Sequence, residues 1–411
     1  MYRWSYRQIL VVLKMMTGPA MFAVGVMMMT AVTAPASKAS SDVPTVAEYV
    51  FVTDFNSGRV LMAKQQDLPM KPASMAKIMT TYIVFARIAE GSLALSDQFV
   101  VSEKAWKMGG SRSFLQAGRS YSLDELLHGV IVQSGNDAAV VIAEGISGSE
   151  ENFVAEMNMT AANLGMKNTR FTNATGWPHP DLTTTAEDLG LLATALIRNF
   201  PVETYPDLYP IFGKKTYTLN KIKQGNRNPL LYGKSAANNG VDGLKTGYTS
   251  ESGYGLVASA ERDGQRVIMV LNGMNSKKER SSESRRLMDF IFREYRSYNF
   301  FTAGEVIDQA EVWLGEARHV SLVLEDEFSK VLSRSERAKT KLSVNWSGPV
   351  PAPISKGQKI GELIIETDGK ITDTLPLLAA ENVRQLGMLD RIGEALKYLI
   401  FGAPIQTEPA K

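Results

Sequence analysis

Three short motifs in this chain combine a nucleophile, two amines and a possible anion-binding pair. They are Ser-Met-Ala-Lys at residues 74–77, Ser-Gly-Asn at residues 134–136 and Lys-Thr-Gly at residues 245–247. A serine becomes a strong nucleophile when an adjacent base takes its proton. A lysine three residues further along a helix lies on the same face as that serine. Ser74 and Lys77 therefore predict acyl-serine chemistry, with the other two motifs completing the site.

Each motif taken alone also has an ordinary structural interpretation. A Ser-x-x-Lys match recurs by chance in a chain of 411 residues, where it can simply open an amphipathic helix. Ser, Gly and Asn are common where one helix ends and another begins, and a strand lysine is usually solvated. Three motifs in order, each in an element that suits its chemistry, favour an enzyme.

The first motif is expected at the start of a helix. Pro72 suits the first turn of a helix, and a largely apolar stretch follows without a break as far as Gly91. The free N–H groups at a helix N-terminus favour negative charge. That charge would develop on the Ser74 oxygen or on a bound acyl oxygen.

The second motif is expected at the break between two helices. Residues 122–125 form a capping box, and the helix that they start is expected to end at Gly135. A second helix is expected over residues 138–145. Polar side chains at such a break can turn toward neighbouring groups. Ser134 and Asn136 are therefore expected to face the nucleophile.

The third motif is expected on a strand at the edge of a sheet. Residues 241–249 precede an alternating hairpin over residues 254–271. Lys245 and Thr246 supply a cation and a hydroxyl donor for a carboxylate. Gly247, having no side chain, allows a ligand backbone to approach the strand closely.

The order of the expected elements predicts an α+β fold. Strands at residues 49–62 and after residue 215 enclose a helical block at 74–200, so one antiparallel sheet is expected, built from both ends and packed by helices. A helix over residues 277–298 would cover that sheet. Short strand-like runs after residue 302 predict a small, β-rich, sandwich-like domain. The expected division is a signal peptide at 1–39, a catalytic domain at 40–302, a β-rich domain at 303–379, an amphipathic helix at 380–403 and a polar tail at 404–411.

The N-terminal segment has the pattern of an export signal. Arg3, Arg7 and Lys14 flank an apolar stretch over residues 15–34, and small residues follow it. Cleavage after residue 36 or 39 is expected. The alternative is an uncleaved membrane anchor, because the apolar stretch nearly reaches spanning length.

The C-terminal segment has the pattern of an amphipathic helix. Over residues 383–401 the large apolar side chains fall on one face, and Arg384, Arg391, Glu394 and Lys397 lie opposite. Such a helix can lie in a membrane interface or dock on the β-rich domain. The pattern alone leaves both open.

Composition excludes several classes of protein. The chain has no cysteine, which excludes disulfides and thiolate metal sites, and its three histidines (His128, His179 and His319) form no ligand cluster. No metal or other cofactor is therefore expected. A formal charge of +2 over 411 residues gives no indication of a nucleic-acid partner.

With their surroundings, the motifs resemble those of the low-molecular-mass D-alanyl-D-alanine carboxypeptidases, in the superfamily of penicillin-binding proteins and serine β-lactamases. The resemblance covers roughly residues 43–380. It rests on the segments at residues 71–77, 133–138, 226–228 and 242–247. It implies a penicillin-sensitive peptidase domain, a smaller β-rich domain and a helix that anchors the exported protein on the outer face of the cytoplasmic membrane.

The resemblance also implies a reaction. Ser74 would attack the penultimate D-alanine carbonyl of a peptidoglycan stem pentapeptide and release the terminal D-alanine, and β-lactams would acylate the same serine. Lys77 must be neutral to accept the proton of Ser74, so its pKa has to be lowered by burial and by a nearby cation, for which Lys245 is the candidate. Ser134 would relay a proton, and Asn136 would orient Lys77 and bind the substrate amide.

The resemblance assigns substrate contacts as well. The backbone N–H groups of Ser74 and Tyr248 would form the oxyanion hole, and Lys245, Thr246 and Arg227 would bind the terminal carboxylate beside Gly247. Many of these carboxypeptidases have histidine where this chain has Tyr248, so a role for that side chain is in doubt. Arg112 is a candidate for one more contact.

Two alternatives remain at this point. A serine β-lactamase of class A needs a deacylating glutamate, and no Glu-x-x-Leu-Asn segment lies between the second and third motifs. A non-catalytic cell-wall-binding protein would not need all of the motif residues, which are intact here. The sequence does not distinguish carboxypeptidase from endopeptidase preference.

Overall fold

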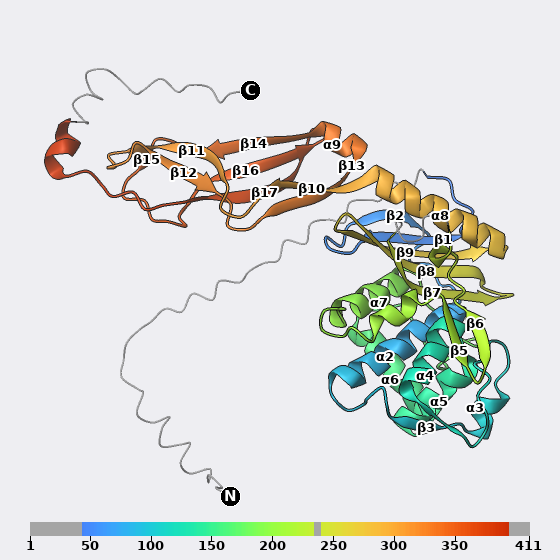
Figure 1. The fold of residues 1–411 in the computed structure, drawn as a ribbon. Coiled ribbons are helices and arrows are strands. Elements are labelled where there is room, and N and C mark those ends of the chain that lie inside the picture. Colours follow the sequence, from blue (N-terminus) through green and yellow to red (C-terminus); the bar gives the residue numbers. More distant parts are fainter. Residues whose placement is uncertain (1–42, 234–239, 394–411) are drawn as a thin grey trace, which may run out of the picture. The chain divides into compact units, whose positions relative to one another are not determined.

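The computed structural model describes residues 43–233 and 240–393 (Figure 1). The predicted signal peptide and residues 394–403 of the predicted C-terminal helix lie outside these residues. Within the described part of the predicted helix, residues 388–393 are helical. The prediction was wrong for residues 380–387, because Val383 and Gln385 form β-bridges with Ile354 and Gly315 and Val383 is buried in the core of the β-rich domain. Within the described ranges, no helix is both long enough and apolar enough to cross a membrane.

One five-stranded antiparallel sheet forms the centre of the catalytic region. Its strand order is β2-β1-β9-β8-β7, and Tyr49 on β1 pairs with Asn272 on β9. The two ends of the region therefore share one sheet, as predicted, and β7, which carries the Lys-Thr-Gly motif, is an edge strand. The strands are β1 (Tyr49–Asp54), β2 (Val60–Lys64), β7 (Val241–Thr249), β8 (Gly253–Arg262) and β9 (Gln265–Met274).

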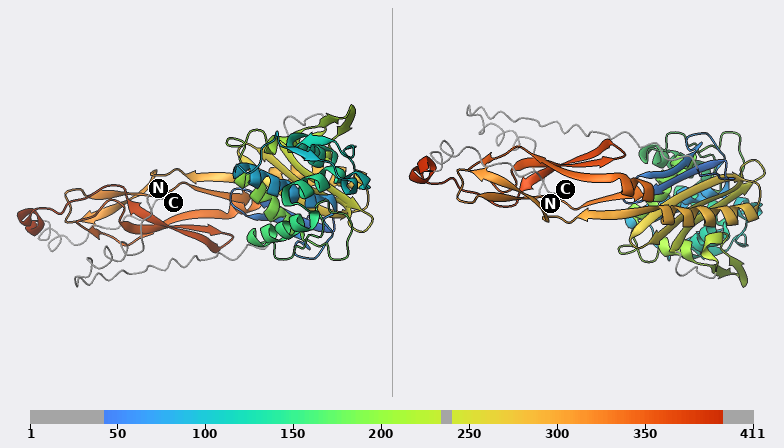
Figure 2. Two further views of the ribbon diagram at one scale, coloured as in Figure 1. Left: turned by 90° about the horizontal axis from the view of Figure 1, so that it is seen from below. Right: turned by 90° about the horizontal axis from the view of Figure 1, so that it is seen from above.

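Helices cover both faces of this sheet (Figures 1 and 2). Alternate residues of β8 point to opposite sides: Val257 packs into the core shared with α2 and α7, and Leu256 packs against Leu287 and Ile291 of α8. Each such side chain, when fully buried, contributes about 1.5–3 kcal/mol. The helices are α2 (Lys77–Ala89), α3 (Glu103–Lys107), α4 (Leu123–His128), α5 (Asn136–Ser147), α6 (Glu150–Asn163), α7 (Ala186–Asn199) and α8 (Lys277–Glu294).

Two small sheets and four short helical turns complete the catalytic region. The sheets are two-stranded and antiparallel: β3 (Gln98–Val100) pairs with β4 (Ser120–Ser122), which follows it after α3, and β5 (Thr216–Leu219) forms a tight hairpin with β6 (Ile222–Gly225). The turns are η1 (Ala73–Ala76), η2 (Gly129–Gln133), η3 (Tyr209–Gly213) and η4 (Pro229–Leu231).

Three local features differ from the sequence prediction. Ser74 lies in the 3₁₀ turn η1, just before α2, and the helix expected to end at Gly135 becomes the π-helical turn η2 after His128. Such π-turns occur frequently at functional sites. The helix expected to reach Tyr298 ends at Glu294, because the residues from Tyr295 onward form strand β10.

The C-terminal part of the described chain is rich in strands, as predicted. A two-stranded sheet joins β10 (Tyr295–Phe301) to β13 (Phe328–Ser333), and a six-stranded sheet has the order β14-β16-β17-β12-β11-β15. Their shared core includes Leu322, Leu363 and Leu377. The other elements are β11 (Val306–Trp313), β12 (His319–Val323), α9 (Arg334–Lys339), β14 (Thr340–Trp346), β15 (Val350–Pro351), β16 (Lys359–Thr367) and β17 (Lys370–Ala379).

Candidate active site

Ser74 lies in a turn that is clamped from two sides. Ala73, directly before it, has φ +46°, which is uncommon for a residue other than glycine. If residue 176 had a side chain in place of Gly176, its Cβ would lie 1.8 Å from the Ala73 carbonyl oxygen. A Cβ at Gly247 on β7 would likewise lie 2.8 Å from the Pro72 carbonyl oxygen. Backbone therefore packs directly on both sides of the turn, while Ser74 itself stays half-buried and accessible.

The amine of Lys77 has three oxygen neighbours. Its Nζ lies 3.2 Å from Ser74 Oγ, 2.7 Å from Asn136 Oδ1 and 2.6 Å from the Thr175 carbonyl oxygen. The Asn136 amide donates to the Gly109 carbonyl at 2.8 Å, which turns its oxygen toward Lys77. A neutral amine has two N–H groups, which suit the two short contacts, and one lone pair, which is then left for the Ser74 hydroxyl proton.

The environment of Lys77 favours this neutral form. The side chain is fully buried, and burial lowers the pKa of Lys77 to about 7, helped by the nearby positive charge of Arg227 and opposed by Asp137. Arg227, which the sequence analysis did not consider for this role, is therefore a cation that acts on Lys77. Lys77 and Lys245 also repel each other, which contributes to lowering the pKa of Lys245.

Lys245 lies among basic side chains that no carboxylate of the described residues neutralises. Burial lowers its pKa well below the usual value, and repulsion from Lys77, Arg227 and Arg280 adds to this. Among the residues that the structure describes, none of these four side chains forms an ion pair with a carboxylate. A bound carboxylate would relieve the repulsion, so the site is electrostatically prepared for an anion beside Thr246.

Ser134 lies at the C-terminal end of η2 in a left-handed conformation, with φ 61° and ψ 33°. Its Oγ is buried and has no hydrogen-bond partner in the described part of the chain. Among the described residues, no hydrogen bond of the Ser134 side chain therefore links it to Lys77 or Ser74. A hydroxyl left without a partner remains able to bond to a substrate.

Two other side chains considered in the sequence analysis, those of Tyr248 and Arg112, make contacts outside the reacting groups. Tyr248 is 53 % exposed, and its ring stacks on Tyr254 with centroids 4.1 Å apart. The Arg112 guanidinium donates to the Trp106 carbonyl oxygen. Neither contact directs the side chain toward Ser74.

The segment around Thr175 was not predicted as part of the site. Asn173 Oδ1 accepts bonds from the Thr175 hydroxyl at 2.8 Å and from the Trp177 N–H at 2.9 Å, which holds the turn that presents the Thr175 carbonyl to Lys77. The Asn-x-Thr-Gly run at residues 173–176 is a turn signal that could have marked it. Every residue type has a backbone carbonyl, so the sequence could not predict that the Thr175 carbonyl contacts Lys77.

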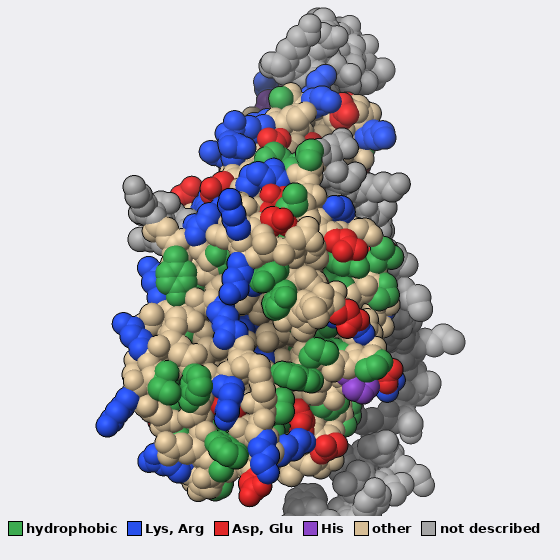
Figure 3. Space-filling model, turned by 90° about the vertical axis from the view of Figure 1, so that its right-hand side faces the viewer, with side chains coloured by type: hydrophobic (Ala, Val, Ile, Leu, Met, Phe, Trp, Pro, Cys, Tyr) green, Lys and Arg blue, Asp and Glu red, His purple; other side chains and the backbone are tan. Residues whose placement is uncertain are grey.

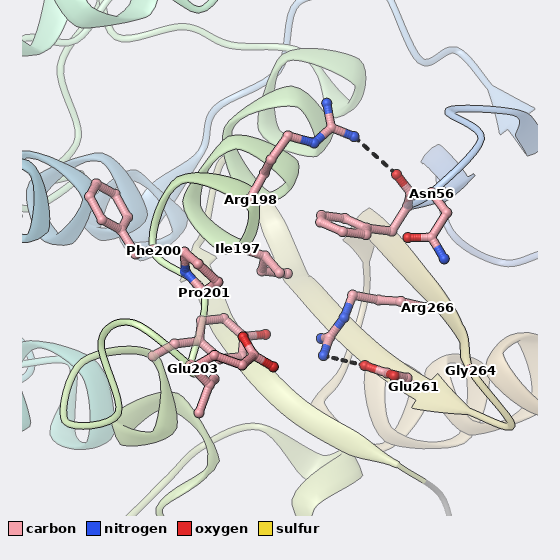
Figure 4. A pocket seen from close by; sticks show the side chains of 12 residues that line it. Asn56, Ile197, Arg198, Phe200, Pro201, Glu203, Glu261, Gly264 and Arg266 are labelled. Carbon is pink, nitrogen blue, oxygen red and sulfur yellow. Dashed lines mark hydrogen bonds and ion pairs between the residues drawn. The ribbon is translucent and has the colours of Figure 1, made fainter.

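A separate cavity of about 290 Å³ lies among the ends of α7, β1 and β8 (Figure 4). Arg198 and Arg266 stand 5.3 and 5.9 Å from the ring centroid of Phe55, and Arg266 also pairs with Glu261. None of the three motifs contributes a residue to its lining. It is therefore distinct from the Ser74 site.

Comparison with known proteins agrees with this geometry. Residues 35–277 match the family described as D-alanyl-D-alanine carboxypeptidase, and residues 295–385 match the C-terminal domain of penicillin-binding protein 5. The chain is 36 % identical over 371 residues to the D-alanyl-D-alanine carboxypeptidase DacA of Haemophilus influenzae, covering 87 % of this chain and 90 % of that protein.

Solved structures show the same similarity. Penicillin-binding protein 5 from Haemophilus influenzae has a TM-score of 0.67 and 34 % identity, with 84 % of this chain and 99 % of that chain covered. Penicillin-binding protein D2 from Listeria monocytogenes, in an ampicillin-bound form, has a TM-score of 0.54 and 28 % identity, with 61 % and 99 % covered.

Proposed function

The chain belongs to the D-alanyl-D-alanine carboxypeptidase family, and we propose that Ser74 is its nucleophile and Lys77 its general base. The enzyme is a serine hydrolase that removes the terminal D-alanine from peptidoglycan stem peptides. One observation supports the assignment most strongly. The Lys77 amine is fully buried, has a pKa lowered to about 7, and lies 3.2 Å from Ser74 Oγ.

The proposed acylation step uses neutral Lys77. Its Nζ accepts the proton of Ser74 as Oγ attacks the penultimate D-alanine carbonyl, and the oxyanion forms between the backbone N–H groups of Ser74 and Tyr248. The proton passes to the leaving amine, directly or through Ser134, as the C–N bond breaks and an ester forms. Water then attacks the ester with Lys77 again as base, which regenerates Ser74.

Substrate binding in this scheme depends on the anion site. Lys245, Thr246 and Arg227 would hold the carboxylate of the terminal D-alanine, and Gly247 leaves room for the peptide backbone along β7. Asn136 would bind the substrate amide as well as orient Lys77. A β-lactam presents a carboxylate and a strained amide to the same groups, so it would acylate Ser74 and act as a covalent inhibitor.

The rate of D-alanine release is expected to follow the protonation of Lys77. Because the pKa of Lys77 is lowered to about 7, the neutral base is plentiful above pH 7 and scarce below it. The value of kcat/KM for a stem pentapeptide should therefore rise roughly tenfold per pH unit up to about pH 7 and then level off. D-Alanine release measured from pH 5 to 9 checks this. A flat profile, with the protein folded throughout, would contradict the assignment of Lys77.

We also propose that the protein is exported and acts in the periplasm or on the extracytoplasmic face of the membrane. In this proposal residues 1–39 are the signal peptide, 40–302 the catalytic domain, 303–387 the β-rich domain, 388–403 the membrane-associating helix and 404–411 a polar tail. The charge and hydropathy patterns at both ends of the sequence support it.

Truncation before Met388, which keeps Val383 in the core of the β-rich domain, is expected to release a soluble enzyme that keeps its peptidase activity. The pattern at residues 383–401 places about six large apolar side chains on one helix face, and each contributes about 1.5 kcal/mol or more when fully buried. Sedimentation with membranes, compared between the full-length and truncated proteins, measures the effect. A full-length protein exported with a foreign signal in place of residues 1–39 is the control. If the truncated protein still sediments while the control does not, the N-terminus is the anchor.

A further inference from the structure

Trp177 follows the turn that contacts both proposed catalytic residues. Two positions before it, the Thr175 carbonyl accepts from Lys77 Nζ at 2.6 Å. Gly176, directly before it, packs on the backbone of Ser74, because a Cβ at Gly176 would lie 3.1 Å from the Ser74 nitrogen. The side chain of Trp177 therefore starts at the wall of the active site.

The indole of Trp177 reaches from this turn to the loop at residues 109–110. Its six-membered ring rests on the backbone there: a Cβ at Gly109 would lie 3.3 Å from Cη2, and one at Gly110 would lie 2.9 Å from Cζ3. The two glycines therefore leave the room that the ring needs. The same Cβ at Gly110 would lie 3.0 Å from Asn136 Nδ2, so the edge of the ring and the Asn136 amide are neighbours.

The backbone around Trp177 is firmly held. Its N–H donates to Asn173 Oδ1 at 2.9 Å and to Thr175 Oγ1 at 3.0 Å, and its carbonyl accepts from Asn173 Nδ2 at 3.0 Å. Further along the loop, Lys71 Nζ donates to the Pro180 carbonyl at 2.7 Å. A side chain that is already held in place loses less conformational entropy when a ligand binds to it.

Much of the indole is open to solvent. Trp177 is 44 % exposed. Scattered exposed hydrophobic side chains are ordinary on a protein surface, and on the face shown in Figure 3 they lie among Lys and Arg side chains. Exposure alone therefore does not mark a binding surface. What distinguishes Trp177 is its place beside Asn136, which is buried and bonds to Lys77 at 2.7 Å.

The Asn136 amide determines which part of a substrate lies against the indole. Asparagine Nδ2 carries two hydrogens, and one of them goes to the Gly109 carbonyl at 2.8 Å, which leaves the other for a substrate carbonyl. In the proposed function, Asn136 binds the substrate amide on the acyl side of the reacting bond. The carbonyl of that amide belongs to the third residue of the stem peptide. The side chain of this third residue therefore leaves the peptide beside Trp177.

The chemistry of the third residue suits an indole. It is a diamino acid, so its side chain is a run of methylene groups that ends in an amine. Methylene groups gain free energy by burying apolar surface on the ring, and tryptophan is the aromatic side chain that attracts an ammonium group most strongly. Asp181 is an exposed carboxylate in the same loop, and its charge favours an amine over an acid.

We propose that the indole of Trp177 is the binding surface for the side chain of the third stem-peptide residue, and that it makes the enzyme prefer substrates with a long, amine-bearing side chain at that position. Trp177 is then a specificity-determining residue that takes no part in proton transfer. The proposal rests on the proposed function, because the roles given to Ser74 and Asn136 define the acyl side of the site.

The test uses three peptides that end in D-Ala-D-Ala and differ only in the residue before it, which is lysine, Nε-acetyl-lysine or alanine. Wild-type kcat/KM for D-alanine release should be about tenfold higher for the lysine peptide than for the alanine peptide, with the acetyl-lysine peptide between them. Trp177→Ala should remove most of this preference. The matched control is Trp106→Ala, which should leave the preference unchanged. Trp106 is 43 % exposed, and it bonds to Arg112 through its carbonyl rather than its ring.

The outcomes separate this proposal from the proposed function. If the wild type releases D-alanine from none of the peptides, the proposed function is wrong. If the wild type cleaves the lysine and alanine peptides with equal kcat/KM, or if Trp177→Ala lowers both values by the same factor, Trp177 has only a structural role and the proposal is wrong. Equal wild-type values for the lysine and acetyl-lysine peptides would overturn the contact with the amine.

A second variant decides the question if Trp177→Ala does not fold. Trp177→Leu keeps an apolar side chain over Gly109 and Gly110 but has no aromatic ring. It should therefore cleave the lysine and acetyl-lysine peptides with nearly equal kcat/KM, because the attraction between the ring and the ammonium group is lost. A wild-type preference for the lysine peptide that persists in Trp177→Leu would overturn the proposal.

Discussion

Replacing Ser74 with alanine is expected to abolish D-alanine release and penicillin binding together. Both reactions need the Ser74 oxygen as the atom that forms the ester, and no other described hydroxyl bonds to the Lys77 amine. Loss of a serine nucleophile should lower kcat by at least about 10⁴-fold, since only binding and oxyanion stabilisation remain. Mass spectrometry of penicillin-treated wild type should place the added mass on the peptide that contains Ser74.

The control for Ser74→Ala is a measurement showing that the variant is still folded. Ser74 is half-buried and Oγ bonds only to Lys77 among the described residues, so the alanine variant should keep nearly the same thermal unfolding midpoint. An adduct on another peptide, or one that persists in Ser74→Ala, would show that a different nucleophile reacts. Ser134, the other serine of the motifs, would then be examined first.

The side chains proposed as catalytic could be recognised as candidates from sequence because their chemistry restricts residue type and spacing. Lys77 and Asn136 come together as expected, at 2.7 Å, although 59 positions separate them. The Thr175 carbonyl, which completes the environment of Lys77, belongs to the backbone, and any residue type can supply it. The role of Arg227 in lowering the pKa of Lys77 depends on how far a long side chain reaches across the site, which spacing does not reveal.

The central sheet could be predicted because local sequence patterns mark most of its strands. Alternating apolar residues and turn signals mark β1, β2, β8 and β9 locally, and their position at both ends of a helical block implies one sheet. The sequence predicts the first residues of β10 as the end of a helix, because no turn signal precedes them. The strand is extended because Tyr295 pairs with Ser333, a contact between residues far apart in the sequence.

The second large effect is expected at Lys77. Removing the amine in Lys77→Ala takes away the only described group placed to accept the Ser74 proton, so acylation by a β-lactam should fall by more than about 10²-fold. This variant also leaves a cavity and two buried acceptors, Asn136 Oδ1 and the Thr175 carbonyl, without their donor. An unsatisfied buried acceptor costs about 1–3 kcal/mol, so lost activity in Lys77→Ala alone could reflect unfolding.

A second variant separates the effect of losing the proton acceptor from the effect of losing the packing of the Lys77 side chain. Lys77→Met fills most of the space of the fully buried lysine with an apolar chain and has no proton acceptor of comparable strength. If Lys77 is the base, both variants should lose acylation by similar factors although Lys77→Met unfolds at a higher temperature than Lys77→Ala. If Lys77→Met folds and acylates at a near-normal rate, the proton of Ser74 goes elsewhere. Ser134 or water would then be the base, and Lys77 would serve only to hold Asn136 and the Thr175 segment in place.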